Sequence, residues 1–170
     1  MTLSTDQSPS YTVPGTSLDT AGELLPAMQR ALDELNELAL TLKHVHWNVV
    51  GPHFIGVHTM IDPQVDGVRL MADAVAERMA ALGASPDGRV RGMVERRQHA
   101  EYPLGRDDAI KHLKELDKVY THVIECHREA IDRTEGDIAT QDLFIGQTRD
   151  LEQFQWFVRA HAENASGKLD

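Results

Sequence analysis

Apolar residues recur at intervals of three and four through four long stretches of the chain, and this spacing predicts four amphipathic helices. Gly51 and Pro52 end the first stretch, Gly83 stands where a C-terminal cap is expected for the second, and Gly136 separates the last two. The predicted helices are residues 20–50, 54–82, 107–134 and 137–163. We therefore expect an all-α fold.

Sequence signals at the helix starts refine these boundaries. Thr20 and Glu23 have the spacing of a capping box, which predicts the start of the first helix. Pro26 is best tolerated in a first turn, so regular helix is expected to begin a few residues after Thr20. Pro63 interrupts the second helix early, which predicts either a kink or a helix start nearer Ile61.

The lengths of the connections predict the topology. The first and third connections are only a few residues long, so each pair of helices they join is antiparallel. The second connection, residues 84–106, can travel the length of a bundle and has room for a short helix around residues 93–99. Four helices with one long crossover form the ferritin-like four-helix bundle. We expect a flexible arm over residues 1–19, the bundle over 20–163 and a short tail over 164–170.

Charge and composition narrow the class of protein. The formal net charge is −10, which favours cations as partners and argues against a general nucleic-acid binder. The single cysteine, Cys126, cannot form a disulfide within the chain. We find neither a secretory signal nor an apolar stretch long enough for a membrane span, so a cytoplasmic location is expected.

The second predicted helix carries two pairs of potential metal ligands, His58 with Asp62 and Asp73 with Glu77. The spacing i, i+4 places the members of each pair on one face, and the eleven residues between Asp62 and Asp73 keep both pairs on that face. Eleven residues rise about 16 Å along a helix, too far for one metal centre. A two-fold contact between two copies would bring one pair opposite the partner's other pair. His46, near the end of the first helix, comes alongside if the turn is short.

Two observations bear on whether these residues bind a metal. Acidic pairs on a helix surface are usually solvated, and a histidine on an apolar seam such as His46 is commonly a packing residue, so spacing alone leaves both interpretations open. Intrasubunit di-iron bundles use Glu-x-x-His motifs, and no glutamate in this chain has a histidine three residues later. An intersubunit centre is the arrangement that remains.

Three segments resemble the Dps family of mini-ferritins. They are HWNVVGPHFIGVHTMID at residues 46–62, ADAVAER at residues 72–78 and QDLFIGQTRDLEQFQWF at residues 141–157. The resemblance covers residues 20–163. It implies a hollow homo-dodecamer with a ferroxidase centre at each two-fold interface, where His46, His58 and Asp62 of one subunit face Asp73 and Glu77 of the next. The expected reaction is oxidation of two Fe(II) per centre, preferably by hydrogen peroxide, with storage of Fe(III) and protection against oxidative stress. Zinc fits the same ligands and could compete.

Other residues have weaker assignments. The family suggests that Trp47 is an electron donor, although a buried packing aromatic is the alternative. The resemblance also places Asp142, with Asp150 two turns later, at a pore through which iron reaches the cavity. Trp156 is expected in the core, and His122 and Cys126 are expected to be ordinary packing residues. The remaining histidines without an identified partner are expected at the surface: His44, His53, His99, His112 and His161.

The alternative function is that of a nucleoid-associated protein that condenses DNA, with iron handling secondary. Many members of the family bind DNA through basic terminal arms. This arm has no Lys or Arg, and the tail has only Lys168, so we expect weak or absent direct DNA binding. Arg89, Arg91, Arg96 and Arg97 form the one local cluster that argues the other way. A bundle that has lost its chemistry is a third possibility, which the complete set of five ligands argues against.

Overall fold

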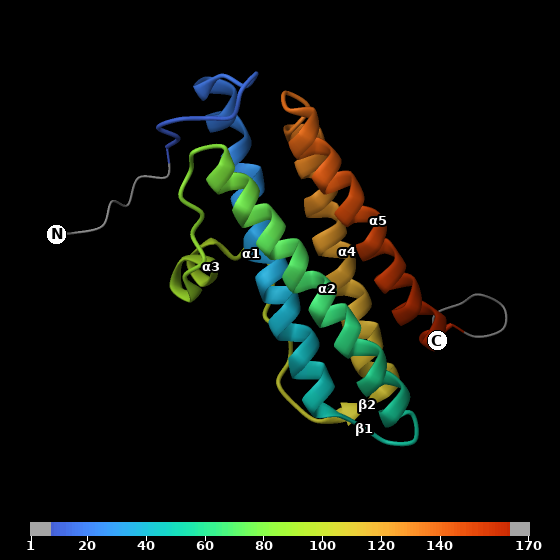
Figure 1. The fold of residues 1–170 in the computed structure, drawn as a ribbon. Helices are drawn as coiled ribbons and strands as arrows, with labels where there is room; N and C mark the ends of the chain where they lie inside the picture. Colours follow the sequence, from blue (N-terminus) through green and yellow to red (C-terminus); the bar gives the residue numbers. More distant parts are fainter. Residues whose placement is uncertain (1–7, 164–170) are drawn as a thin grey trace.

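Four long helices lie side by side in a computed structural model that describes residues 8–163 (Figure 1). They are α1 (Leu18–Asn48), α2 (Phe54–Ala81), α4 (Ala109–Arg133) and α5 (Ile138–Ala162). The helix α1 packs chiefly on α2, α4 packs chiefly on α5, and α1 also contacts α4. The predicted four-helix bundle is therefore confirmed, with helix bounds within two residues of the expected ones.

The crossover between α2 and α4 contains a short helix, α3 (Val90–Arg96), which begins three residues before the expected one. Figure 1 shows α3 beside α1, after which the chain continues along the bundle to its far end. There the two-residue strands β1 (Val49–Val50) and β2 (Asp107–Asp108) pair in parallel. This pairing, which the sequence analysis did not predict, ties the end of α1 to the start of α4.

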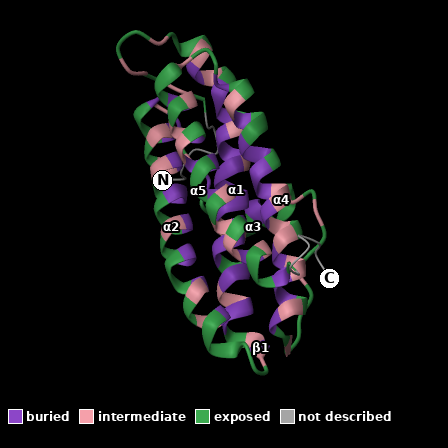
Figure 2. Ribbon diagram, turned by 90° about the vertical axis from the view of Figure 1, so that its right-hand side faces the viewer, coloured by how far each residue is buried: buried purple, intermediate pink, exposed green. Residues whose placement is uncertain are grey.

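The helices bury their apolar seams against one another, as the purple inward-facing residues of Figure 2 show. Leu35, Leu42 and Ile61 are fully buried, and burying such a side chain contributes about 1.5–3 kcal/mol. Tyr120 is also fully buried and satisfies its hydroxyl by donating to Gln64 Oε1 at 2.6 Å. Packing on this shared core is the main source of stability for helices of this length.

The helix starts differ from the sequence-based expectation. Ser17, whose side chain accepts a hydrogen bond from the Thr20 backbone N–H, is the N-cap of α1, so the predicted Thr20–Glu23 capping box is wrong. Pro26 and Pro63 lie inside α1 and α2, and both helices continue through them. A proline inside a helix costs about 3 kcal/mol. Buried residues on both sides of each proline offset that cost.

Gly83 ends α2 as predicted, with a φ of +86°. A Cβ at this position would lie 1.9 Å from the Tyr11 backbone oxygen, so the residues before α1 pass directly against the end of α2. The Tyr11 hydroxyl also reaches the Ala80 carbonyl at 3.4 Å. Residues 1–7 of the predicted arm and the predicted tail 164–170 lie outside the described residues. Within residues 8–163, none of the helices is long and apolar enough to cross a membrane.

Candidate metal centre

His46 and His58 lie face to face where α1 turns into α2. Gly51, with a φ of +94°, and the hydrogen bond from Phe54 N–H to the Gly51 carbonyl make this turn short. The last turn of α1 therefore lies beside the first turn of α2. The two imidazole rings stack with their centroids 3.6 Å apart, and His46 is buried.

Each imidazole donates its Nδ1–H to the backbone carbonyl of the other histidine, and both distances are 3.0 Å. These two hydrogen bonds fix the tautomer of each ring, so each Nε2 atom carries the lone pair. Metal-binding histidines in proteins are commonly oriented in this way by a backbone carbonyl at the second nitrogen. This orientation leaves the Nε2 atom as the potential ligand of each neutral ring.

Asp62 adds a carboxylate to this pair. It lies one turn after His58, and its Oδ1 atom is 3.2 Å from His46 Nδ1. Lys43 Nζ donates to the same oxygen at 2.9 Å, and this hydrogen bond lowers the pKa of Asp62. Half of the Asp62 side chain is exposed, so its second oxygen is open to solvent and to ions.

Asp73 and Glu77 lie on the same continuous helix α2, and both are exposed. Asp73 stands eleven residues beyond Asp62, a rise of about 16 Å. Within one chain, the structure therefore brings together His46, His58 and Asp62 but leaves Asp73 and Glu77 three turns away. These two carboxylates remain available for a neighbouring molecule.

The two tryptophans are both exposed. Trp47 is 70% exposed, so it is not a buried packing residue, and Lys43 Nζ lies 5.9 Å from the centroid of its ring. Trp156 is 61% exposed, and its predicted place in the core is wrong. The buried positions of α5 include Leu151, Gln155 and Val158, which leaves Trp156 on the opposite side of the helix.

Asp142 and Asp150 lie on α5, and both are exposed. Eight residues separate them, which corresponds to about 12 Å along the helix. The assignment of these carboxylates to a pore for iron remains a prediction.

Three of the five histidines expected at the surface make buried or clustered contacts. The Nε2 atom of His44 is buried, and its ring lies 5.7 Å from that of Tyr102 between centroids. His112 is buried and its Nδ1 lies 3.0 Å from the Tyr102 hydroxyl oxygen, and burial lowers the pKa of His112. His99 converges with His122 on Glu34, so the expectation that His99 has no convergent partner is wrong, whereas the assignment of His122 to ordinary packing stays a prediction. The sequence analysis also missed Lys43 and Glu34. Lys43 could have been found from its spacing from His46. Glu34 could have been found because it is a charged residue on the apolar seam of α1.

The comparisons with known proteins agree with this architecture. A ferritin-like domain family matches residues 25–167. The fine tangled pili major subunit of Haemophilus ducreyi is 51% identical over 160 residues, which cover 94% of this chain and 85% of that protein. A DNA protection during starvation protein of Mycolicibacterium smegmatis is 52% identical over 161 residues, which cover 94% and 88% of the two proteins.

The comparison with solved structures also agrees with this fold. DpsA14 from Streptomyces coelicolor has a TM-score of 0.94 and 58% sequence identity to this chain, and the match covers 97% of this chain and 99% of that one. The resemblance drawn from the three sequence segments is thereby confirmed. The chain belongs to the Dps family of ferritin-like, iron-handling mini-ferritins.

Proposed function

We propose that this protein is a ferroxidase and iron store whose centre is shared between two subunits. His46, His58 and Asp62 come from one chain, and Asp73 and Glu77 come from its two-fold partner within a homo-dodecamer. The observation that carries the proposal is the pair of reciprocal hydrogen bonds between His46 and His58, which orients both rings at one turn, with the half-exposed Asp62 carboxylate one helical turn after His58.

The ligand set suits iron as a substrate. Imidazole nitrogen and carboxylate oxygen bind iron in both oxidation states, and five side chains around two ions leave positions open for an oxidant. Hydrogen peroxide is the proposed oxidant. Two Fe(II) ions each give one electron, the O–O bond breaks, and two protons complete two water molecules. Because both electrons arrive at one centre, no hydroxyl radical is released, and the Fe(III) passes to a mineral inside the cage.

Lys43 and Trp47 have secondary roles in this proposal. The Lys43 ammonium occupies the Asp62 oxygen in the absence of iron and is displaced when Fe(II) binds. Trp47 lies within reach of Lys43 on an exposed surface, where it can supply an electron to the centre. Asp142 and Asp150 are proposed to attract Fe(II) toward the cavity, because exposed carboxylates concentrate cations.

A subunit-mixing experiment tests the shared centre. His46→Ala and Asp73→Ala each damage every centre when assembled alone, so both should lose peroxide-dependent Fe(II) oxidation. When the two variants are reassembled in equal amounts, half of the two-fold pairs are mixed, and each mixed pair has one intact centre. About one quarter of the wild-type rate should therefore return. If the mixture stays as inactive as the separate variants, the shared centre is wrong.

Direct DNA binding is proposed to be weak. Each arginine of the cluster in residues 89–97 is paired with a carboxylate, which removes most of the local positive charge. The pairs are Arg89 with Asp87, Arg91 with Glu95, Arg96 with Asp33 and Asp87, and Arg97 with Glu37. Phosphate binding needs unpaired cations. A clear gel shift with duplex DNA at about 150 mM salt and neutral pH would contradict this proposal.

A further inference from the structure

Glu34, His99 and His122 form a second cluster of potential metal ligands, away from the turn that holds His46 and His58. Glu34 lies on α1, His122 lies on α4, and His99 lies on the crossover just after α3. His122 Nε2 is 3.1 Å from Glu34 Oε1, and His99 Nε2 is 3.2 Å from Glu34 Oε2. The two imidazole rings lie 4.5 Å apart between centroids. One potential ligand atom from each of the three residues therefore lies within 4.8 Å of the other two.

The buried polar atoms of Glu34 and His122 would be stabilised by a cation. Glu34 is only 6% exposed, and a buried carboxylate is costly without a partner. His122 Nε2 is buried as well, and among the described residues it has no aligned hydrogen-bond partner, although Glu34 Oε1 is close. A metal ion bound by both atoms would satisfy each of them.

His99 shows the orientation expected of a metal ligand. Its Nδ1 donates to the Ala100 backbone carbonyl at 3.0 Å, which places the lone pair on Nε2, toward the Glu34 carboxylate. In the neutral ring, a lone pair that faces a carboxylate oxygen is unfavourable unless a proton or a metal ion lies between them. A backbone carbonyl that holds the second nitrogen is also the usual support of a metal-binding imidazole.

We propose that Glu34, His99 and His122 bind a divalent transition-metal ion of the zinc type, independently of the iron centre. Two imidazole nitrogens and one carboxylate oxygen form a common zinc ligand set, which leaves one position for water. With bonds of about 2.0–2.1 Å, neighbouring ligand atoms of a tetrahedral site lie about 3.3 Å apart. His122 Nε2 lies 3.1 Å from Glu34 Oε1 and His99 Nε2 lies 3.2 Å from Glu34 Oε2, so each nitrogen is close to that distance from one oxygen of the carboxylate.

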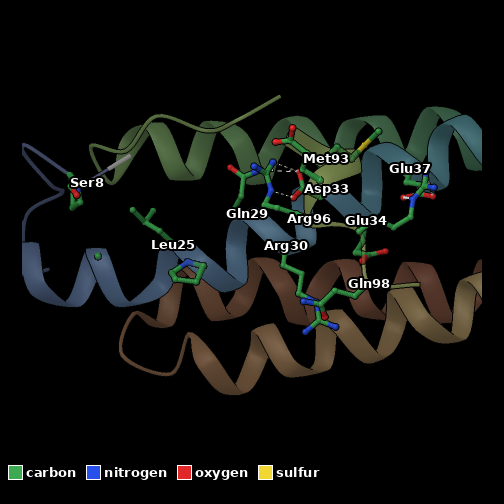
Figure 3. A pocket seen from close by; sticks show the side chains of 15 residues that line it. Ser8, Leu25, Gln29, Arg30, Asp33, Glu34, Glu37, Met93, Arg96 and Gln98 are labelled. Carbon is green, nitrogen blue, oxygen red and sulfur yellow. Dashed lines mark hydrogen bonds and ion pairs between the residues drawn. The ribbon is translucent and has the colours of Figure 1, made fainter. Parts of the chain in front are cut away.

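An ion can reach this site from a groove between α1 and α3. Figure 3 shows Glu34 and Glu37 among the side chains that line this groove, which encloses about 820 Å³. Glu37 Oε2 lies 3.5 Å from His99 Nε2, and Arg97 holds the Glu37 carboxylate in place at 3.0 Å. Glu37 therefore supplies a second carboxylate at the rim of the site. A bound ion would join α1, the crossover and α4.

Zinc titration of the assembled protein tests the proposal. The background is His46→Ala/Asp73→Ala, which disables the proposed iron centre, so the result does not depend on whether that centre is correct. Calorimetry should show one zinc ion bound per chain. Adding His99→Ala or His122→Ala should weaken that binding by at least about 100-fold, more than the loss of an outer-shell partner costs. His161→Ala, which removes an exposed histidine of α5, is the matched control and should leave zinc binding unchanged.

Two measurements keep the test decisive if a variant assembles poorly. Cobalt(II) added to the same background should give the strong visible absorption of a tetrahedral site, and Glu34→Gln should abolish it. Crystals of the wild-type protein soaked in zinc should show an anomalous peak between the three side chains. Unchanged zinc binding in the His99 and His122 variants, or no peak at this position, would overturn the proposal and leave a carboxylate–imidazolium cluster.

Discussion

The two ligand clusters differ in how they are assembled. His46, His58 and Asp62 come from one hairpin, where a short turn sets their relative positions. In the proposed iron centre, the full set of five ligands is divided between two copies of the chain. Glu34, His99 and His122 come from three segments that are distant in sequence, and their set is complete within one copy. Spacing along a helix reveals the first cluster. Only the folded chain reveals the second, because the crossover places His99 beside α1 and α4.

The largest expected effect separates the two clusters directly. His46→Ala/His58→Ala removes both nitrogen ligands of the iron centre, so the initial rate of peroxide-dependent Fe(II) oxidation should fall by at least about 1000-fold, more than outer-shell losses cost. Zinc binding at Glu34 should persist. Stopped-flow absorbance of Fe(III) measures the rate, and His53→Ala, at an exposed position of the same turn, is the control. A double variant that retains its rate would remove these histidines from the centre.

Cys126 is a potential fourth ligand of the second cluster, because it lies one turn after His122 on α4. Burial raises the pKa of its thiol to about 12, so the thiol stays neutral at physiological pH. Since the thiolate is the reactive form, labelling of native protein by a thiol reagent at pH 8 should be on the order of 1000-fold slower than labelling of the unfolded chain. Zinc should not change the native rate. A zinc-dependent change would make Cys126 a fourth ligand.

Zinc should also raise the temperature of unfolding. At a free concentration 100 times its dissociation constant, a ligand of the folded state contributes about 2.7 kcal/mol. For a chain of this size, that corresponds to a shift of roughly 5–10 °C. Differential scanning calorimetry of the His46→Ala/Asp73→Ala protein with and without zinc measures the shift, which adding His99→Ala should abolish. The same shift with and without His99→Ala would point to zinc bound elsewhere.

The smallest expected effect concerns Lys43. Replacing it with alanine frees the Asp62 oxygen, so Fe(II) oxidation at low iron concentration should accelerate, by no more than about fivefold because the ion pair is exposed to solvent. Lys43→Arg keeps the pair and serves as the control. A slower Lys43→Ala protein would mean that the ammonium supports the centre instead of competing with the ion.

The sequence predicted the features that depend on local periodicity. The four long helices, the Gly83 cap and the antiparallel pairs all follow from the spacing of apolar residues and from the connection lengths. The sequence predicted that His46 comes close to His58 if the turn is short. It did not predict that the two rings stack, because the turn geometry at Gly51 decides the ring orientation. The assignment of Asp73 and Glu77 to a shared centre remains a prediction.

The errors have a common physical cause, which is that contacts between distant segments outweigh local preferences. Pro26 and Pro63 stay inside helices because the core packing around them offsets the lost hydrogen bonds. The β1–β2 pairing depends on where the crossover returns, which no local pattern encodes. Glu34 is a charged residue among the buried positions of α1, and its partners His99 and His122 come from the crossover and from α4.

In the proposed iron centre, the reciprocal hydrogen bonds between His46 and His58 preorganise both histidine ligands. Each ring is oriented by the backbone of the other helix, so the loss of side-chain freedom occurs when the chain folds and not when the ion arrives. Binding and release of iron at these nitrogens then require no rearrangement of the turn. The two rings of such a centre therefore keep the same orientation after each iron ion has left.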